Sequence, residues 1–228
     1  MHRSVAGGLP RAAVFGVNDG LVSNVSLILA FAGGGAGASV VRLAGIAGAV
    51  AGAISMAAGE WVSISAQNEL IRREVEVERR ELERHPVAET AELAGMYEAH
   101  GMEPDQAQRA AADVMRQPDE ALMVHAREEL GVDPEGLASP WKAAALSLVC
   151  FLVGALAPVI PWLGSSTGTA PTLVSIAIGV VLAGVVGALI AGFAERPIVR
   201  SIVRQVLIVL GACAVTYAIG QLVGVSVS

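Results

Sequence analysis

Long apolar stretches alternate with short polar links along most of this chain, and one long polar segment interrupts them. A helix needs about 20 apolar residues to cross a hydrocarbon core of about 30 Å. Five stretches reach that length, and we place them at 12–33, 43–64, 143–163, 172–194 and 205–224. The pattern therefore predicts five transmembrane helices, with a large polar insert between the second and the third.

The polar insert has the pattern of a small helical domain. No Gly or Pro occurs between Gly59 and Pro86, so we expect the second span to continue beyond the bilayer until Pro86 ends or kinks the helix. Gly and Pro then bound three further helices, near 87–100, 104–117 and 119–130. Apolar side chains in the insert are candidates for a modest core, namely Leu82, Leu93, Met96, Tyr97, Val114, Leu122 and Leu130.

The predicted fold class is all-α, a polytopic membrane protein with five transmembrane helices and a cytosolic helical domain inserted after the second. We divide the chain into 1–66 for helices 1 and 2, 67–138 for the insert, and 139–228 for helices 3 to 5. The composition of 54% hydrophobic residues with 26 glycines and 4% aromatics is typical of membrane helices that pack through small residues. Cys150 and Cys213 lie in apolar blocks, and we expect both to be buried apolar side chains.

The positive charges predict an orientation, because Lys and Arg favour the cytoplasmic side of a membrane. With the N-terminus inside, 14 of the 15 Lys and Arg residues fall on the cytoplasmic side, and Arg42 is the exception. The first apolar block is too long for a cleavable signal peptide. We therefore expect the N-terminus and the insert in the cytoplasm, and the compact chain favours a prokaryotic plasma membrane.

Acidic residues gather in the insert and point to cations. Of the 21 Asp and Glu residues, 18 lie between Glu69 and Glu135. Within them, Glu78 and Glu81 are three residues apart and so share a helix face, and Glu89 and Glu92 repeat that spacing after Pro86. Two such carboxylate pairs could surround divalent metals with hard oxygen ligands. The spacing also fits a solvated face with salt bridges to nearby arginines, namely Arg79, Arg80 and Arg84.

Two polar faces lie inside the predicted spans. Asp19, Ser23 and Ser26 share one face of the first span, and a carboxyl group at that depth is costly enough to suggest a function. The alternative is an interfacial Asp19 that pairs with Arg11. Met56 and Glu60 share a face of the second span with Ser63 and Gln67. A thioether among oxygen ligands suits a borderline metal such as Fe²⁺, and buried carboxylates could carry protons.

Motifs in the first span, the second span and the insert resemble those of the vacuolar iron transporter family. They are NDGLVSN in the first span, GAISMAAGEWVS in the second, and ERRELERHP, ETAELAGMYEAHG and AREELG in the insert. The resemblance covers nearly the whole chain and includes five spans with a cytosolic helical insert after the second. It implies a homodimeric antiporter that moves Fe²⁺, and often Mn²⁺, out of the cytosol in exchange for protons.

The resemblance also implies roles for individual residues. Asp19 matches the aspartate of the translocation path, Met56 the methionine of a family motif, and Glu60 the acid of a Gly-Glu motif. The metal-binding carboxylates of the cytosolic domain correspond to Glu78, Glu81, Glu89, Glu92 and Glu129. Where the family often has a Met-Met pair, this chain has His125-Ala126, so His125 either replaces a soft ligand with imidazole or the site loses a ligand.

We therefore predict a proton-coupled exporter of divalent metal, with Fe²⁺ as substrate and Mn²⁺, Co²⁺ or Zn²⁺ as further candidates. No prosthetic group and no nucleic-acid partner are expected. The alternative is a membrane-anchored metal sensor or scaffold without transport. A di-iron enzyme would need Glu-x-x-His motifs, and the residues three before His85, His100 and His125 are Leu82, Tyr97 and Leu122. We therefore expect no enzymatic activity.

Overall fold

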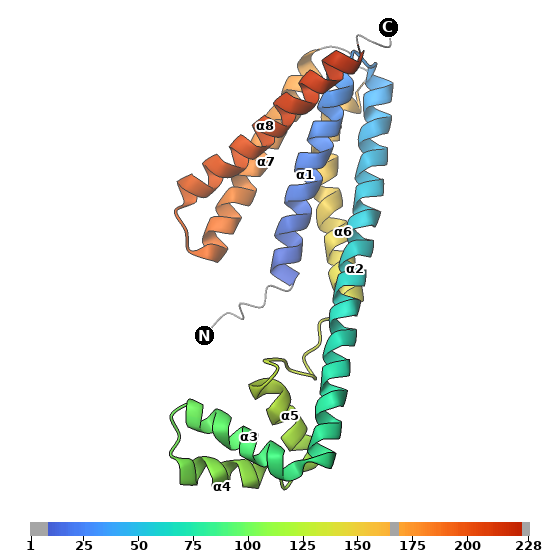
Figure 1. The fold of residues 1–228 in the computed structure, drawn as a ribbon. Helices are drawn as coiled ribbons and strands as arrows, with labels where there is room; N and C mark the ends of the chain where they lie inside the picture. The colour runs from blue at the N-terminus through green and yellow to red at the C-terminus, as the bar shows by residue number, and fades with distance from the viewer. Residues whose placement is uncertain (1–8, 165–168, 225–228) are drawn as a thin grey trace. The chain divides into compact units, whose positions relative to one another are not determined.

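The computed structural model describes residues 9–164 and 169–224, and these form α-helices and one 3-10 helix without any strand (Figure 1). The predicted all-helical class is confirmed. The elements in chain order are α1 Leu9–Gly33, α2 Ala38–Arg84, α3 Pro86–Ala99, α4 Pro104–Val114, α5 Pro118–Glu128, α6 Pro140–Leu156, η1 Ala157–Trp162, α7 Thr169–Ala194 and α8 Ile198–Gly224.

The helices belong to two compact units. The membrane unit comprises the chain up to Trp61 and from Pro140 onward, and the insert comprises Val62–Ser139. The helix α2 begins in the membrane unit and ends in the insert without a break. Five helices, α1, α2, α6 with η1, α7 and α8, are long and apolar enough to cross a membrane. Many of their large apolar side chains are exposed, as expected of an integral membrane protein whose surface contacts lipid.

In the membrane unit, α1 packs against α6, α7 and α8 (Figure 1). One cluster of buried side chains joins α1 to the α7–α8 hairpin through Leu21, Val25, Leu29, Ala183, Val209 and Cys213. The approach of α1 to α6 is closer still, because a Cβ atom on Gly154 would collide with the carbonyl oxygen of Val17. Such contacts between small residues allow helix backbones to approach closely in a membrane.

A buried amide joins three helices of the membrane unit. Asn24 on α1 is 2% exposed, and its Nδ2 donates hydrogen bonds to the carbonyl oxygens of Gly45 on α2, at 3.1 Å, and Ala155 on α6, at 2.5 Å. Apolar packing also joins two of these helices, since Ala49 and Ala53 on α2 contact Phe151 on α6. The first two spans and the third therefore surround a shared polar contact.

The connection between the last two spans is shorter than the sequence suggests. Predicted spans at 172–194 and 205–224 leave an Arg-bearing turn that extends to Arg204. In the structure α8 begins at Ile198, so Arg200 and Arg204 lie in its first two turns. Pro197 precedes the helix, a position where proline's fixed φ and missing N–H cost little. Arg196 is the arginine that remains in the turn.

The insert folds around small side chains more than the sequence suggests. Its core consists of Leu93, Ala94, Ala107 and Ala111 from α3 and α4, with Tyr97, Val114 and Val124 packed against it. Leu122 is also buried, whereas Leu82, Met96 and Leu130 are half-buried. Alanines at the contact let α3 and α4 approach closely, which leaves less room for the larger predicted residues. Asn68 on α2 donates to the carbonyl oxygen of Ala138 at 2.9 Å and so joins the two ends of the insert.

Candidate metal centre

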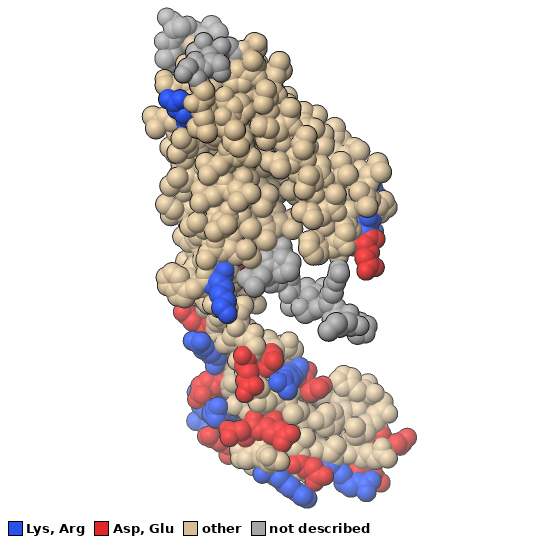
Figure 2. Space-filling view, turned by 180° about the vertical axis from the view of Figure 1, so that it is seen from behind, with Lys and Arg blue, Asp and Glu red and all other residues tan. Residues whose placement is uncertain are grey.

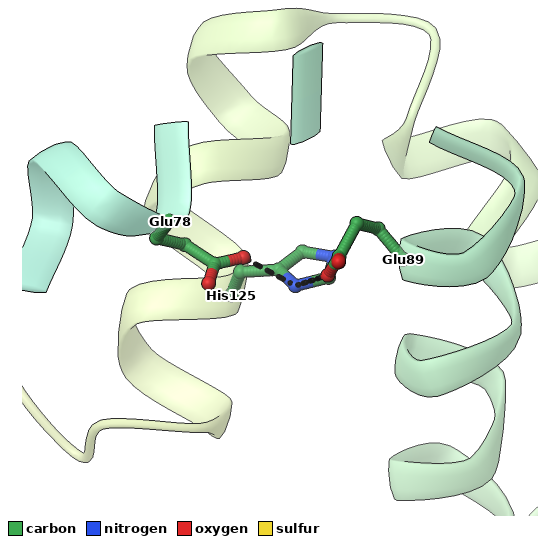
Figure 3. Close-up of side chains that lie close together, drawn as sticks. All are labelled: Glu78, Glu89 and His125. Carbon is green, nitrogen blue, oxygen red and sulfur yellow. Dashed lines mark ion pairs between the residues drawn. The ribbon is translucent and has the colours of Figure 1, made fainter. Parts of the chain in front are cut away.

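Three helices of the insert bring Glu78, Glu89 and His125 together, from α2, α3 and α5 respectively (Figure 3). The Nδ1 atom of His125 lies 3.0 Å from Oε1 of Glu78 and 3.8 Å from Oε2 of Glu89. One ligand atom from each residue can be chosen so that all lie within 4.8 Å of one another. A divalent ion with bonds of about 2.0–2.6 Å can span ligand atoms at such separations.

The chain reversal at His85 places the first two of these residues face to face. The last turn of α2 closes with a hydrogen bond from the His85 amide to the Glu81 carbonyl oxygen, at 2.7 Å. His85 then leaves the helical conformation, with φ −128° and ψ 44°, and Pro86 begins α3. Proline lacks the amide hydrogen that would continue α2 but suits the first turn of a new helix. Glu89, in that first turn, consequently faces back toward Glu78.

All three side chains are withdrawn from solvent. His125 is 0% exposed, Glu78 7% and Glu89 8%. Among the residues that the structure describes, Oε1 of Glu78 and both ring nitrogens of His125 have no hydrogen-bond partner. The 3.0 Å contact between His125 and Glu78 thus lacks the geometry of a hydrogen bond. A buried polar atom without a partner costs about 1–3 kcal/mol, and a bound cation would supply a partner for Oε1 of Glu78 and for one ring nitrogen of His125.

Burial and neighbouring charge shift the acid–base properties of the cluster. Burial, together with the Glu129, Glu89 and Glu92 carboxylates, raises the pKa of Glu78 from 4.5 to about 7. Burial also raises the pKa of Glu89, and Glu92 and Glu129 add to the effect. For His125 burial lowers the pKa, against the opposing influence of Glu129 and Glu92. The imidazole is therefore neutral near pH 7, the form in which histidine binds metals.

The other three predicted carboxylates surround this buried cluster. Glu81 is half-buried, and Glu92 and Glu129 are exposed, yet each of them raises the pKa of a buried carboxyl group. The structure thus brings all six predicted residues into one acidic cluster. The interpretation as a solvated face with arginine salt bridges gains no support. Within the described residues, arginines form ion pairs with Glu76, Asp113 and Asp133 and with none of the five predicted carboxylates.

The three residues predicted for the transport path also lie together in the structure. Asp19, Met56 and Glu60 line a groove of about 500 Å³ in the membrane unit, together with Phe15, Ser23, Asn24, Leu27, Gly48, Gly52, Ser55, Gly59 and Phe151. Asp19 is exposed in the groove, whereas Met56 and Glu60 are half-buried. Ser26 is on the predicted polar face but does not line this groove. The side chain of Arg11, the alternative partner of Asp19, lies outside the described residues.

Sequence reasoning missed two polar residues of the groove, Asn24 and Ser55. Asn24 lines it beside Asp19 and Ser23, although it lies off the helix face that we predicted. Its signal was the second Asn of NDGLVSN, whose buried amide joins α1 to two other helices. The groove therefore offers carboxylate, thioether, hydroxyl and amide groups along α1 and α2.

The comparisons with known proteins cover both regions. The VIT family matches residues 10–221, which include the acidic cluster and the groove. The chain belongs to the VIT family. This confirms the resemblance that the motifs indicated. Curated relatives of this VIT-family protein include the vacuolar iron transporter of Acanthamoeba castellanii, which is 34% identical over 84% of this chain and 71% of its own length.

Plant proteins give further matches to this VIT-family protein. Vacuolar iron transporter 1 of Oryza sativa subsp. japonica is 27% identical over 96% of this chain and 86% of its own length. Vacuolar iron transporter 1 of Eucalyptus grandis is 30% identical over 69% of this chain. That match covers 64% of the Eucalyptus protein, slightly less than two thirds. The chain is thus an integral membrane protein of a transporter family.

Proposed function

We propose that this VIT-family protein exports Fe²⁺ from the cytosol in exchange for protons, with Mn²⁺ as a second substrate. The observation that carries the proposal is the buried cluster of Glu78, Glu89 and His125, in which Oε1 of Glu78 and both ring nitrogens of His125 lack hydrogen-bond partners. The family match to proteins named vacuolar iron transporters supports iron as the metal. The acidic cluster is then the site that collects the metal.

The ligands of this site are Glu78, Glu89 and His125, with Glu81, Glu92 and Glu129 as rim carboxylates. Carboxylate oxygens alone would suit Mg²⁺, Ca²⁺ and Mn²⁺, while imidazole favours Fe²⁺, Co²⁺ and Zn²⁺. The rim carboxylates are exposed or half-buried, so they can meet a hydrated cation before it loses water. An ion that enters the buried cluster displaces the proton of Glu78, whose pKa is raised to about 7.

The membrane groove supplies the path. Asp19 and Glu60 would hold the charge of the cation, and Met56 would contact it through sulfur, a ligand that favours Fe²⁺ over harder ions. Protons that move inward would neutralise the two carboxylates and release the metal on the far side. The helix α2 carries Met56 and Glu60 of the groove as well as Glu78 of the insert.

The direction of transport rests on the charge distribution. The distribution of Lys and Arg favours a cytoplasmic N-terminus and insert, so the acidic cluster would face the cytosolic metal pool. We infer a homodimer, as the family resemblance implies. A role as metal sensor or scaffold is the second candidate, because the insert is a compact unit with its own core.

Proteoliposomes distinguish these functions. Protein with its insert outside should take up Fe²⁺ faster when the lumen is more acidic than the bath, and a protonophore should remove the difference. Asp19→Asn should abolish uptake, while Thr216→Val, whose hydroxyl bonds to its own helix, should transport normally. Metal binding without flux would establish the sensor or scaffold instead. Flux that ignores the pH gradient would overturn proton coupling.

A further inference from the structure

We propose that the α7–α8 hairpin binds the headgroup of an anionic phospholipid through Arg196, Arg200 and Arg204. These side chains line a hollow of about 820 Å³ with Pro197, Ser201, Val203, Leu207 and Ile208. In Figure 2 blue atoms, with red atoms beside them, lie at this end of the largely tan membrane unit. The inference concerns a different surface from the metal sites and does not depend on transport.

The spacing of the arginines places them in one row. Arg200 and Arg204 are four residues apart in α8, so they lie one above the other on a helix face. Arg196 precedes them by four residues in the turn that joins α7 to α8, where its amide donates to the Ala191 carbonyl oxygen at 3.1 Å. All three side chains are exposed. Guanidinium groups in such a row can hold the oxygens of a phosphate through paired hydrogen bonds.

None of the three arginines has an ion-pair partner among the described residues. Each ion pair found among the described residues belongs to the insert, and none involves Arg196, Arg200 or Arg204. The sequence from Arg196 to the C-terminus contains no Asp or Glu, and Glu195 is the acid nearest to the row. Three exposed positive charges at the end of membrane-length helices are therefore available to an external anion.

The apolar side chains that line the hollow favour a lipid as that anion. Val203, Leu207 and Ile208 line the same hollow and are 49%, 63% and 47% exposed. They belong to a helix of membrane length, so their exposed faces suit acyl chains. A free phosphate would use the arginines alone, whereas a phospholipid would contact both parts. Basic residues at the end of a membrane helix are a recognised means of binding anionic lipid.

The charge contribution sets the size of the expected effect. Each basic residue near an anionic membrane surface strengthens binding about fivefold, so loss of three should weaken it about a hundredfold. Apolar contacts from Val203, Leu207 and Ile208 should persist and leave a weak preference for any phospholipid. The arginines should therefore control the choice between phosphatidylglycerol and phosphatidylcholine more than total lipid binding.

Native mass spectrometry of the full-length, metal-free protein in detergent would test the site. Titration with phosphatidylglycerol should give retained lipid adducts, and phosphatidylcholine should give few. The triple variant Arg196→Gln, Arg200→Gln, Arg204→Gln should lose the phosphatidylglycerol adducts about a hundredfold. Its control is Arg79→Gln, Arg116→Gln, Arg127→Gln, which removes the same charge from arginines paired with acids in the insert and should bind as the unmodified protein does.

Two further comparisons distinguish lipid binding from binding of inorganic phosphate and from a nonspecific effect of net charge. Inorganic phosphate at equal concentration should not displace the lipid, because it lacks acyl contacts. Undiminished phosphatidylglycerol binding by the α8 triple variant would overturn the site, as would an equal loss in the insert triple variant. Displacement by inorganic phosphate would assign the arginines to a free anion. Since the protein is metal-free throughout, these outcomes are independent of the proposed transport.

Discussion

Nδ1 of His125 lies 3.0 Å from Oε1 of Glu78 without a hydrogen bond between them, inside a part of the insert that is closed to solvent. Burial lowers the pKa of the imidazole and raises that of the carboxyl group to about 7. The lowered pKa leaves the ring neutral, so the contact gains little from an ion pair. A neutral nitrogen and a carboxylate oxygen that face each other across a small gap form half of a metal coordination sphere.

Replacement of His125 should therefore change which metals the insert prefers. We expect His125→Ala to weaken Zn²⁺ and Co²⁺ binding by at least about 10–100-fold, the loss that removal of even an outer partner of a metal ligand causes. Mn²⁺ binding should weaken less, because Mn²⁺ relies more on oxygen. Calorimetric titration of the full-length protein with each metal measures the two affinities.

The control for that variant is His100→Ala. His100 is an exposed histidine of the same insert and lies 3.6 Å from a carboxylate oxygen of Glu128. It should leave both affinities unchanged. Equal weakening of Zn²⁺ and Mn²⁺ binding by His125→Ala would show that the ring supports the site without coordinating the metal.

Protons should compete with metal at Glu78. Because the pKa of this carboxyl is about 7 in the metal-free protein, the group is largely protonated below that pH and must lose its proton when metal binds. Affinity should consequently fall by up to about tenfold for each pH unit below 7. Glu78→Gln should bind metal weakly and with a flatter pH dependence. Titrations between pH 5.5 and 8 measure the slopes, and Glu76→Gln, on the exposed side of the same helix, should keep the original slope.

The same shift predicts how Glu78 affects stability without metal. A carboxyl whose pKa is raised on folding stabilises the fold below its unfolded pKa of 4.5 and loses that contribution as pH rises to about 7. Thermal unfolding should show Glu78→Gln gaining stability relative to the unmodified protein as pH increases over this window. The effect of His125 on stability runs in the opposite direction with pH. Because folding lowers its pKa, protonation destabilises the fold as pH drops below about 6.5. A difference between the two proteins that stays constant with pH would contradict the assignment to Glu78.

The sequence predicted which residues would form the acidic cluster better than how they would be buried. Helical spacing places Glu78 with Glu81 on one face and Glu89 with Glu92 on another, and Pro86 indicates the reversal between them. On α5, Val124 packs against the core that Ala107 and Ala111 of α4 form with α3, and alanine carries little signal in an apolar pattern. The full burial of His125 therefore follows from tertiary packing that the spacing does not contain.

The predicted start of the last span was wrong because it relied on the pattern of charged residues. Arginines usually mark the loop beside a span, so a loop extending to Arg204 was expected. A long arginine side chain can instead leave its helix sideways and keep its charged end in water. The helix α8 then begins two turns earlier, at Ile198. In the groove, Asn24 was missed because its amide lies off the face shared by Asp19 and Ser23.

A change of Met56 to leucine should affect transport of Fe²⁺ more than transport of Mn²⁺. Leucine keeps the approximate volume of methionine and usually costs less than about 1.5 kcal/mol, while the thioether is lost. We expect the KM for Fe²⁺ to rise several-fold and that for Mn²⁺ to change little, since Mn²⁺ gains less from sulfur. Flux measurements in proteoliposomes with each metal give both values. Met96→Leu, a half-buried methionine of the insert, is the control, and an equal rise for both metals would indicate a purely steric role for Met56.

The contact between α1 and α6 should depend on the absence of a side chain at Gly154. A Cβ atom there would collide with the Val17 carbonyl oxygen and crowd the Leu21 amide, so Gly154→Ala must push two backbones apart. We expect a loss of about 1–3 kcal/mol, the usual cost of overpacking a core. Gly192→Ala, also in a membrane helix, has open space for the new methyl group and should keep or slightly raise stability, because alanine favours helix by about 1 kcal/mol over glycine. Thermal unfolding in detergent compares the variants. Equal stability of the two would mean that α1 and α6 separate without cost, and the predicted metal path between α1 and α2 would then lack its rigid support.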